Sequence, residues 1–372
     1  MFKYFLPRIA LILSSVLFVL SCSTESTIEE LDVDIQSENL IQSQLIEEEE
    51  STFINLDKVT KPENTSAQSG GGNCNHVVII NGYAYASCNS QLIISNLETG
   101  EIATQNMSII DVAADEVRSL LFTYNGSTIR LFSLDNPMAP QEEDTASASF
   151  SIFTGFSAAG CTLAVSGGTS NTTVYRYSID PYELVLTSSG IPAVDNVTGT
   201  PNVHVALTAP GEITAFYSQD IGAVANWAIQ PAIFNGAAEL QSTPQRTVLT
   251  PLPFTGSFNA PFAPTNFGVE SEYLDDRLYV AHFAVPGIEV VDVATGNLLS
   301  PINLSFEPIN VATDGSLLFV VGPDHSTVDI INPSSGATLD TLGSLQTPTG
   351  VAANATHIAV ADQSLGLVII ER

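Results

Sequence analysis

Residues 277–298 read RLYVAHFAVPGIEVVDVATGNL, and this stretch decides the fold. It contains two short apolar runs, each of the length that forms one buried strand, and it ends just after a Thr-Gly turn. Related pairs of apolar runs recur at 83–100, 316–336 and 357–370. Because short apolar runs bounded by turn residues form strands, the sequence predicts an all-β protein built from a repeated unit.

The turns between the apolar runs indicate how the strands connect. Asn81-Gly82 separates VVII from YAYA and predicts a two-residue hairpin, because both turn positions require positive φ. Asp314-Gly315 occupies the same place in a later repeat. Four antiparallel strands repeating about every 40 residues are typical of a β-propeller blade. Counting predicts seven four-stranded blades, at 75–107, 108–147, 148–190, 191–262, 263–304, 305–343 and 344–372.

Closure of the ring raises a separate question, because residues 344–372 supply only three strands. A propeller completes such a blade by taking the missing strand from the other end of the domain. Residues 51–60, which include Phe53–Val59, are the nearest candidate for this outer strand. The alternative is a ring that closes without a borrowed strand.

The repeats resemble those of the YVTN-type seven-bladed propellers of bacterial surface and periplasmic proteins. Their pattern is roughly Tyr-Val-Ala/Thr, a short gap, Val-x-Val-Ile-Asp and then Thr-x-Thr-Gly, and residues 278–299 (LYVAHFAVPGIEVVDVATGNLL) match it best. The match covers four of the seven blades at motif level. The WD40 family fits poorly, because Trp227 is the only tryptophan and no Gly-His/Trp-Asp repeat occurs.

The beginning of the chain predicts that the protein is exported and anchored in a membrane. Lys3 and Arg8 precede the apolar run Ile9–Leu20, which fits a signal-peptide core and is short for a membrane-spanning helix. The run leads into VLSC, which resembles the bacterial lipobox. The resemblance implies removal of residues 1–21, lipidation of Cys22 (diacylglycerol and a further acyl chain such as palmitate) and anchoring in a membrane. Ser23 in place of Asp favours the outer membrane. An ordinary signal peptide or an uncleaved anchor is the alternative.

Composition limits the possible partners. The chain carries 40 acids against 10 Lys and Arg, a net charge of −30, so a nucleic-acid partner is disfavoured. Residues 22–73 hold 12 of the acids and end in a Gly-rich run, so they are expected to form a disordered tether between the anchor and the domain. The hydrophobic fraction of 44% supports a large core in residues 74–372.

The cysteines predict one disulfide. If Asn81-Gly82 is the hairpin turn, position 75 faces position 88, and Cys74 lies one step from Cys88. A modest distortion or a bulge would then allow the bridge, which an exported protein can form. A metal site is the alternative, although no third cysteine or suitably spaced histidine accompanies the pair. Cys161 is expected to be a buried small hydrophobe.

Candidate binding residues lie in loops. Propeller ligands usually meet the face that carries the links between blades and the loops joining the second and third strands. Residues 231–262 are expected to form a long insertion on this face, rich in Phe and Pro. The candidates are His282, Asp324, His325 and Asp362 from the loops and Phe254 and Phe258 from the insertion. The first four are also weighed as an acid–base or metal cluster, against the simpler interpretation that loop residues are polar anyway.

Three functions remain open at this stage. We find no strong catalytic motif, no cofactor site and no Lys in residues 74–372. The leading hypothesis is an envelope-anchored binding module that presents one face of the ring to a protein, peptide or glycan. The first alternative is a hydrolase or lactonase acting on a small extracytoplasmic substrate. The second is a structural envelope protein with an acidic, soluble surface.

Overall fold

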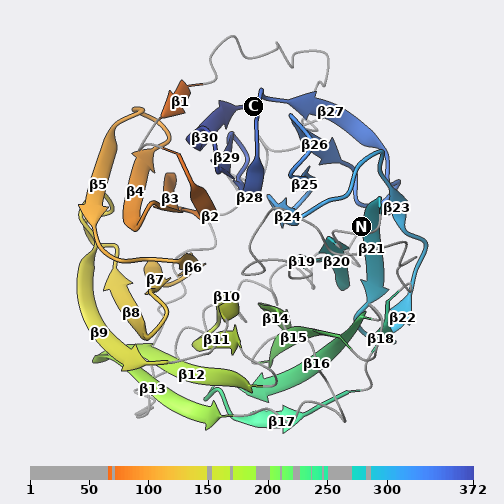
Figure 1. The fold of residues 1–372 in the computed structure, drawn as a ribbon. Coiled ribbons are helices and arrows are strands. Elements are labelled where there is room, and N and C mark those ends of the chain that lie inside the picture. The colour runs from red at the N-terminus through yellow and green to blue at the C-terminus, as the bar shows by residue number, and fades with distance from the viewer. Residues whose placement is uncertain are drawn as a thin grey trace, which may run out of the picture.

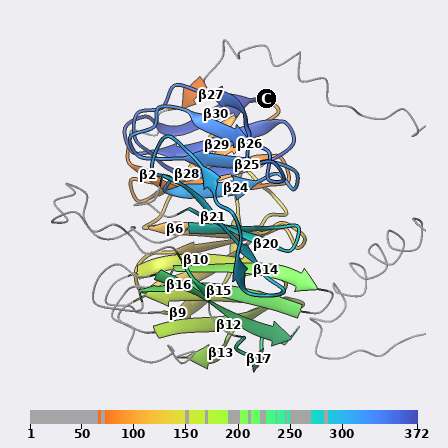
Figure 2. The same ribbon diagram turned by 90° about the vertical axis from the view of Figure 1, so that its right-hand side faces the viewer.

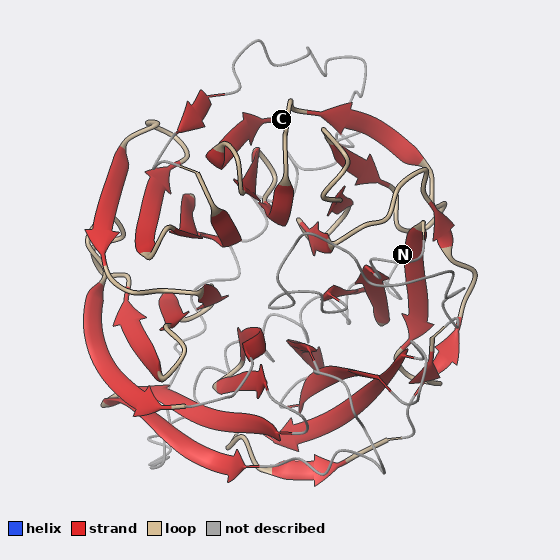
Figure 3. Ribbon diagram, viewed as in Figure 1, coloured by secondary structure: helices blue, strands red, loops and turns tan. Residues whose placement is uncertain are grey.

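The structure is a computed structural model. It describes residues 66–68, 72–148, 153–167, 171–189, 202–209, 212–220, 227–235, 237–244, 247–249, 270–281 and 286–372. Within these residues every regular element is a β-strand, as Figure 3 shows. No helix long and apolar enough to cross a membrane occurs in this described part of the chain.

The strands form seven antiparallel sheets arranged as a ring (Figure 1), so the chain is a seven-bladed β-propeller. Blade 1 contains β2 (Cys74–Ile80), β3 (Tyr83–Cys88), β4 (Gln91–Asn96) and β5 (Ile102–Asn106). Blade 2 contains β6 (Asp111–Asp115), β7 (Leu120–Tyr124), β8 (Thr128–Ser133) and β9 (Gln141–Ser147). Blade 3 contains β10 (Phe153–Ala159), β11 (Thr162–Gly167), β12 (Asn171–Ile179) and β13 (Tyr182–Ser189).

The remaining blades follow the same meander, with the first strand innermost. Blade 4 contains β14 (Asn202–Ala209), β15 (Glu212–Asp220), β16 (Trp227–Asn235), β17 (Leu240–Ser242) and β18 (Thr247–Val248). Blade 5 contains β19 (Glu270–Leu274), β20 (Arg277–Ala281), β21 (Gly287–Asp292), β22 (Asn297–Leu298) and β23 (Ile302–Asn303). Blade 6 contains β24 (Asn310–Thr313), β25 (Leu318–Val321), β26 (Val328–Ile331) and β27 (Thr338–Leu342). Blade 7 contains β28 (Pro348–Ala353), β29 (His357–Asp362) and β30 (Gly366–Glu371).

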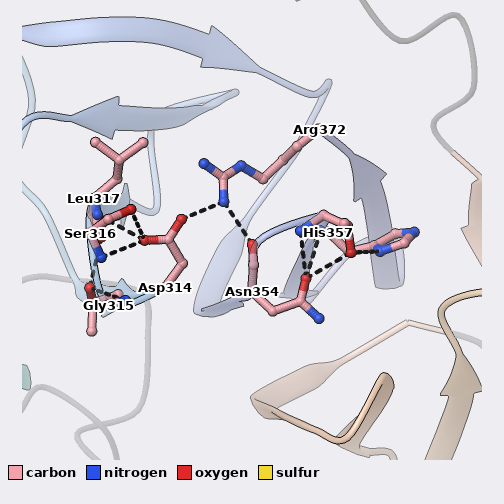
Figure 4. Close-up of polar contacts among 9 residues, drawn as sticks. Asp314, Gly315, Ser316, Leu317, Asn354, His357 and Arg372 are labelled. Carbon is pink, nitrogen blue, oxygen red and sulfur yellow. Dashed lines mark hydrogen bonds and ion pairs between the residues drawn. The ribbon is translucent and has the colours of Figure 1, made fainter. Parts of the chain in front are cut away.

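A strand from the beginning of the domain completes blade 7. β1 (Ser66–Gln68) pairs antiparallel with β30, from Ser66 opposite Ile369 to Gln68 opposite Leu367. The expected closing strand at 51–60 lies outside the described residues. At the C-terminal end of β30, Arg372 also reaches Asp314 in blade 6 (Figure 4). The ring therefore closes with a borrowed strand.

The core lies between successive blades rather than at the centre of the ring. Each sheet buries apolar side chains on both faces, as in the cluster that Phe319, Val321, Ile358 and Ile370 form between blades 6 and 7. Such double-sided burial explains why the strands read as continuous apolar runs instead of alternating ones. The apolar area removed from water supplies the main stabilising free energy of the ring.

The first hairpin confirms the predicted disulfide and its register. Asn81 and Gly82 have φ of 49° and 80°, and Ile80 lies opposite Tyr83. The pairing shifts by a bulge between Cys74 and His76, which brings Cys74 opposite Cys88, and the two cysteines are bonded.

Two further expectations have mixed outcomes. Cys161 is fully buried at the turn before β11, as expected, but it is disulfide-bonded, so the expectation of an unbonded small hydrophobe is wrong. The long insertion expected at 231–262 is wrong in its first half. Residues 231–235 instead continue β16, and β17 and β18 pair along its outer edge. Residues 250–269 lie outside the described residues.

The meander gives the ring two different faces, which Figure 2 shows edge-on. The loop face carries the connections from second to third strands, such as 322–327 and 363–365, and the links between blades. The hairpin face carries the turns between first and second strands, such as 81–82 and 314–317.

Candidate functional site

His325 is held in a fixed position on the loop face. Its ring stacks on Phe306, with centroids 3.7 Å apart and an interplanar angle of 5°. Its Nε2 lies 2.8 Å from Asp329 Oδ1 and 2.9 Å from Thr327 Oγ1. The His325 side chain nevertheless keeps 23% of its surface exposed. The structure thus presents an imidazole that is both ordered and accessible.

A close approach of two loops creates this arrangement. Phe306 lies in the link between blades 5 and 6, and Gly322 begins the loop that carries His325. A Cβ at Gly322 would lie 2.4 Å from the Glu307 carbonyl oxygen and 2.7 Å from Phe306 Cδ2. Glycine is therefore required here, because any side chain would push the Phe306 ring away from the His325 loop.

The other described candidates on this face, Asp324 and Asp362, differ in their exposure. Asp324 precedes His325 and is exposed. Asp362 is fully buried at the end of β29. Its Oδ2 accepts hydrogen bonds from the backbone N–H groups of Gln346 and Thr347, at 2.8 and 3.0 Å. Its Oδ1 accepts from the N–H groups of Ser364 and Leu365, at 2.8 and 2.9 Å. Asp362 thus holds two loops together.

A second polar group lies on the innermost strands. His76 on β2 and Asp111 on β6 come from neighbouring blades, and His76 Nδ1 lies 3.3 Å from Asp111 Oδ1. The two side chains are 20% and 3% exposed. Burial lowers the pKa of His76, although the negative charge of Glu270 counteracts this, and burial raises the pKa of Asp111 well above its usual range.

Carboxyl groups on β19 extend this polar lining. Glu270 and Glu272 are two residues apart and share one side of the strand. Burial, reinforced by the charge of Glu270, raises the pKa of Glu272 to about 8. His204 on β14 stacks on Phe216, and burial lowers its pKa to about 4. Around the inner edge of the ring (Figure 1), β2, β6, β14 and β19 therefore hold titratable groups whose neutral forms burial favours.

The sequence-predicted and structure-derived residues overlap only in part. His325 lies in the loop after the second strand of blade 6, and Asp362 ends the second strand of blade 7. His282, Phe254 and Phe258 lie outside the described residues. Sequence reasoning missed Asp111 and Glu272. The available signal was charge inside apolar strands of a chain with only 13% charged residues.

The chemistry that these groups permit is proton exchange and polar recognition. In the described part of the chain, no three or more His, Cys, Asp or Glu side chains are placed to hold a metal ion. The His76–Asp111 pair can share one proton in a buried setting, which is the arrangement used for general acid–base work. The ordered His325 ring offers a stacking surface and a hydrogen-bonding nitrogen to a bound molecule.

Comparison with solved structures supports the fold. The chain is similar to a chain of the mitotic checkpoint complex (TM-score 0.59, 10% identity, covering 84% of this chain and 92% of that one). It is also similar to a chain of Kuenenia stuttgartiensis hydrazine synthase (TM-score 0.57, 12% identity, covering 83% and 98%). Saccharomyces cerevisiae Sqt1 gives a TM-score of 0.51 at 10% identity, covering 81% and 96%. No family model and no curated protein matches the sequence.

Proposed function

We propose that this propeller is an envelope-anchored binding module that captures a protein or peptide through its loop face. The seven-bladed fold is compatible with an interaction module. The observation that carries the proposal is the His325 ring, which Phe306 and Asp329 fix in place while part of it stays exposed. Ordering such a side chain before binding removes part of the entropy that association would otherwise lose.

Two neighbouring features support the same face. Asp324 is exposed beside His325 and adds a negative charge for a partner to meet. Asp362 holds the corresponding loop of blade 7 through four backbone hydrogen bonds. The loops that face a partner on this side of the ring are therefore held in place before binding.

The test compares two histidines on opposite faces. His325→Ala removes the ring on the loop face, and His357→Ala removes a partly buried histidine beside the hairpin-face turn at 354–356. Full-length chains are used to capture partners from envelope extract, with melting curves as the control for folding. We expect His325→Ala to lose the captured protein and His357→Ala to retain it. Equal capture by both variants, or capture of nothing by the unmodified chain, contradicts the proposal.

A short deletion tests whether the segment between blades 4 and 5, part of which lies outside the described residues, takes part in binding. Removing 235–260 would delete β17 and β18, because these strands cover the edge of β16. A deletion of 251–266 spares every described strand. Loss of capture with an unchanged melting temperature would assign Phe254, Phe258 or their neighbours to the binding face.

The lipid anchor is a separate part of the proposal. The lipobox at VLSC predicts that Cys22 carries acyl chains and holds the protein at the outer membrane. Expression in bacteria with labelled palmitate should label the unmodified chain and leave Cys22→Ser unlabelled. Equal labelling of both chains, or of neither, excludes lipidation at Cys22.

The hydrolase or lactonase remains the second candidate because of one observation. The His76–Asp111 pair is a buried acid–base pair near the carboxyl group of Glu270. Turnover of esters or lactones that Asp111→Asn abolishes, with an unchanged fold, would favour this function over binding alone. Turnover that survives Asp111→Asn, or no turnover by the unmodified chain, would exclude it.

A further inference from the structure

A cleft of about 280 Å³ lies between blades 4 and 5 on the hairpin face, away from the loop-face residues described above. Its walls come from β14, β15 and β16 on one side and from β19, β21 and their turns on the other. The lining residues are Thr208, Glu212, Thr214, Pro231, Ile233, Pro244, Tyr273, Asp276, Val293 and Ala294. Its volume lies near the lower limit for small-molecule sites, so it suits one side chain or a small amine rather than a large ligand.

The cleft coincides with an interruption of the outer edge of blade 4. Pro231 lies in the middle of β16 and has no N–H to donate to an outer partner. β17 pairs with Ile233 and Phe234, and β18 pairs with Ala228 and Ile229, so the outer strand is split around Pro231. Figure 1 shows these two short strands along the outside of β16.

The Gln230 side chain fixes the split. Its Nε2 lies 3.0 Å from the carbonyl oxygen of Pro231 and 2.6 Å from that of Pro244. The gap is therefore a stable feature, because the segment around Pro244 is tied to β16 by a side chain in place of the missing ladder hydrogen bonds.

Polar groups on both walls of the cleft are held in place by hydrogen bonds. Thr208 Oγ1 lies 3.1 Å from Glu212 Oε1 and 2.8 Å from Thr214 Oγ1. On the opposite wall, the Tyr273 hydroxyl donates to Asp276 Oδ1 at 2.9 Å. In each carboxylate, a hydroxyl group thus holds one oxygen in place. The other oxygen accepts neither of these two hydrogen bonds.

The charged side chains that line the cleft are both acidic. None of its lining residues is Lys, Arg or His, and in the described part of the chain no ion pair involves Glu212 or Asp276. The Tyr273 ring stacks on Phe216, with centroids 6.2 Å apart, and Tyr273 also lines the cleft. Burial and the Asp276 hydrogen bond raise the pKa of Tyr273 to about 12, so its hydroxyl stays protonated and continues to donate.

From these contacts we infer that the cleft between blades 4 and 5 binds the cationic side chain, lysine or arginine, of a partner polypeptide. Two positioned carboxylates attract the charge, and an aromatic ring with two prolines contacts the aliphatic stem. The inference is independent of the loop-face proposal, because the two sites lie on opposite faces of the ring.

The test uses short capped peptides of defined composition. Ac-Gly-Arg-Gly-NH2, its Lys counterpart and its Glu counterpart are titrated into the full chain at physiological salt, with binding followed by ligand-detected NMR. We expect saturable binding of the Arg or Lys peptide and no binding of the Glu peptide. Absence of saturable binding by both cationic peptides, or equal binding of the Glu peptide, overturns the inference.

The adjacent acid Asp275 gives a matched control. Asp275 and Asp276 both have positive φ, of 51° and 59°, and Asn tolerates this conformation at either position. Asp276→Asn and Glu212→Gln should each weaken binding about tenfold, the effect of losing one charge-assisted hydrogen bond. Asp275→Asn removes the same charge from a residue outside the cleft and should leave binding within about twofold. Equal weakening by Asp275→Asn and Asp276→Asn would overturn the inference, because only the net charge would then matter.

One arginine of the chain itself needs its own variant. Arg246 follows Pro244 by two residues and lies outside the described residues. Arg246→Gln is therefore titrated in parallel. Binding by the unmodified chain supports an external cation. Binding that appears only in Arg246→Gln overturns the inference, because the native chain would then supply its own cation.

Discussion

Removal of the Arg372 guanidinium tests how blades 6 and 7 are joined on the hairpin face. Arg372 Nη1 donates to Asp314 Oδ2, at 2.5 Å, and to the Asn354 carbonyl oxygen, at 2.7 Å, and Figure 4 shows both contacts. Its guanidinium carbon also lies 4.7 Å from the centroid of the Phe319 ring. The Arg372 and Asp314 side chains are 17% and 4% exposed, so these contacts are largely shielded from water.

Arg372→Met keeps the aliphatic stem and removes the charge. A net hydrogen bond to a charged group is worth about 1.5–3 kcal/mol, and a cation–π contact adds about 0.5–1 kcal/mol. Asp314 keeps hydrogen bonds from the N–H groups of Ser316 and Leu317, which limits the loss. We therefore expect the free energy of unfolding to fall by about 2–3 kcal/mol and the melting temperature by about 5 °C.

The assay is urea unfolding of the full chain, completed as a double-mutant cycle with Asp314→Asn. The Asn side chain can still accept the turn hydrogen bonds through Oδ1, so the cycle isolates the contact with Arg372. We expect a coupling free energy of about 1–2 kcal/mol. Coupling near zero, or a loss below about 0.5 kcal/mol in Arg372→Met, refutes the view that this contact joins the two blades.

The contact between Arg372 and Asp314 also predicts that the free energy of unfolding depends on pH. Burial alone would raise the pKa of Asp314, but hydrogen bonds from the Leu317 N–H, the Arg372 guanidinium and Ser316 outweigh it and lower that pKa below its ordinary value. The unfolded state then takes up the proton first as the pH falls. The contribution of Asp314 is therefore present above its unfolded pKa and is lost as the pH falls through the folded value. The difference in free energy of unfolding between the unmodified chain and Arg372→Met should therefore decrease as the pH falls through the pKa of Asp314 in the folded chain.

Three further perturbations follow from other contacts. Cys74→Ser removes the disulfide to Cys88, which closes a loop with a sequence separation of 14. We expect the free energy of unfolding, measured in urea, to fall by about 3 kcal/mol. A reductant should abolish the difference between the two chains. Tyr177→Phe removes a buried hydroxyl that donates to Asp115 at 2.6 Å and should cost about 1.5–3 kcal/mol by thermal unfolding, whereas an unchanged melting temperature would contradict the importance of that bond. Glu272→Gln should stabilise the chain increasingly as the pH rises from 4.5 to about 8, because folding then keeps a proton on Glu272 that the unfolded chain releases; parallel pH profiles of unfolding would disprove this.

Local chemistry explains why much of the fold is predictable from the sequence. The Asn81-Gly82 turn sets the register of its hairpin because both residues adopt positive φ, and this register then places Cys74 near Cys88. The blade boundaries follow from apolar runs and turn residues that lie within one repeat. Each of these features depends only on residues close together in the sequence.

Features that depend on ring geometry are not predictable in this way. His76 and Asp111 belong to different blades and meet only because their innermost strands lie side by side. The closing strand Ser66–Gln68 reads SAQ and has no apolar pattern, because an edge strand contributes backbone hydrogen bonds without needing buried side chains. The split of the outer strand around Pro231 likewise requires knowing that β16 is long enough to carry two short partners.

The contacts at the seam between blades 7 and 1 indicate that the inner strand β2 takes part in closing the ring. Thr349 Oγ1 lies 2.9 Å from the Cys74 carbonyl oxygen and 3.1 Å from that of Asn75. A Cβ at Gly350 would lie 3.1 Å from the same Asn75 oxygen, so the two innermost strands approach closely. Among the described residues, β1 adds three paired residues at the outer edge. Because the disulfide fixes the Cys74 end of β2, it reinforces the strand against which the last blade closes.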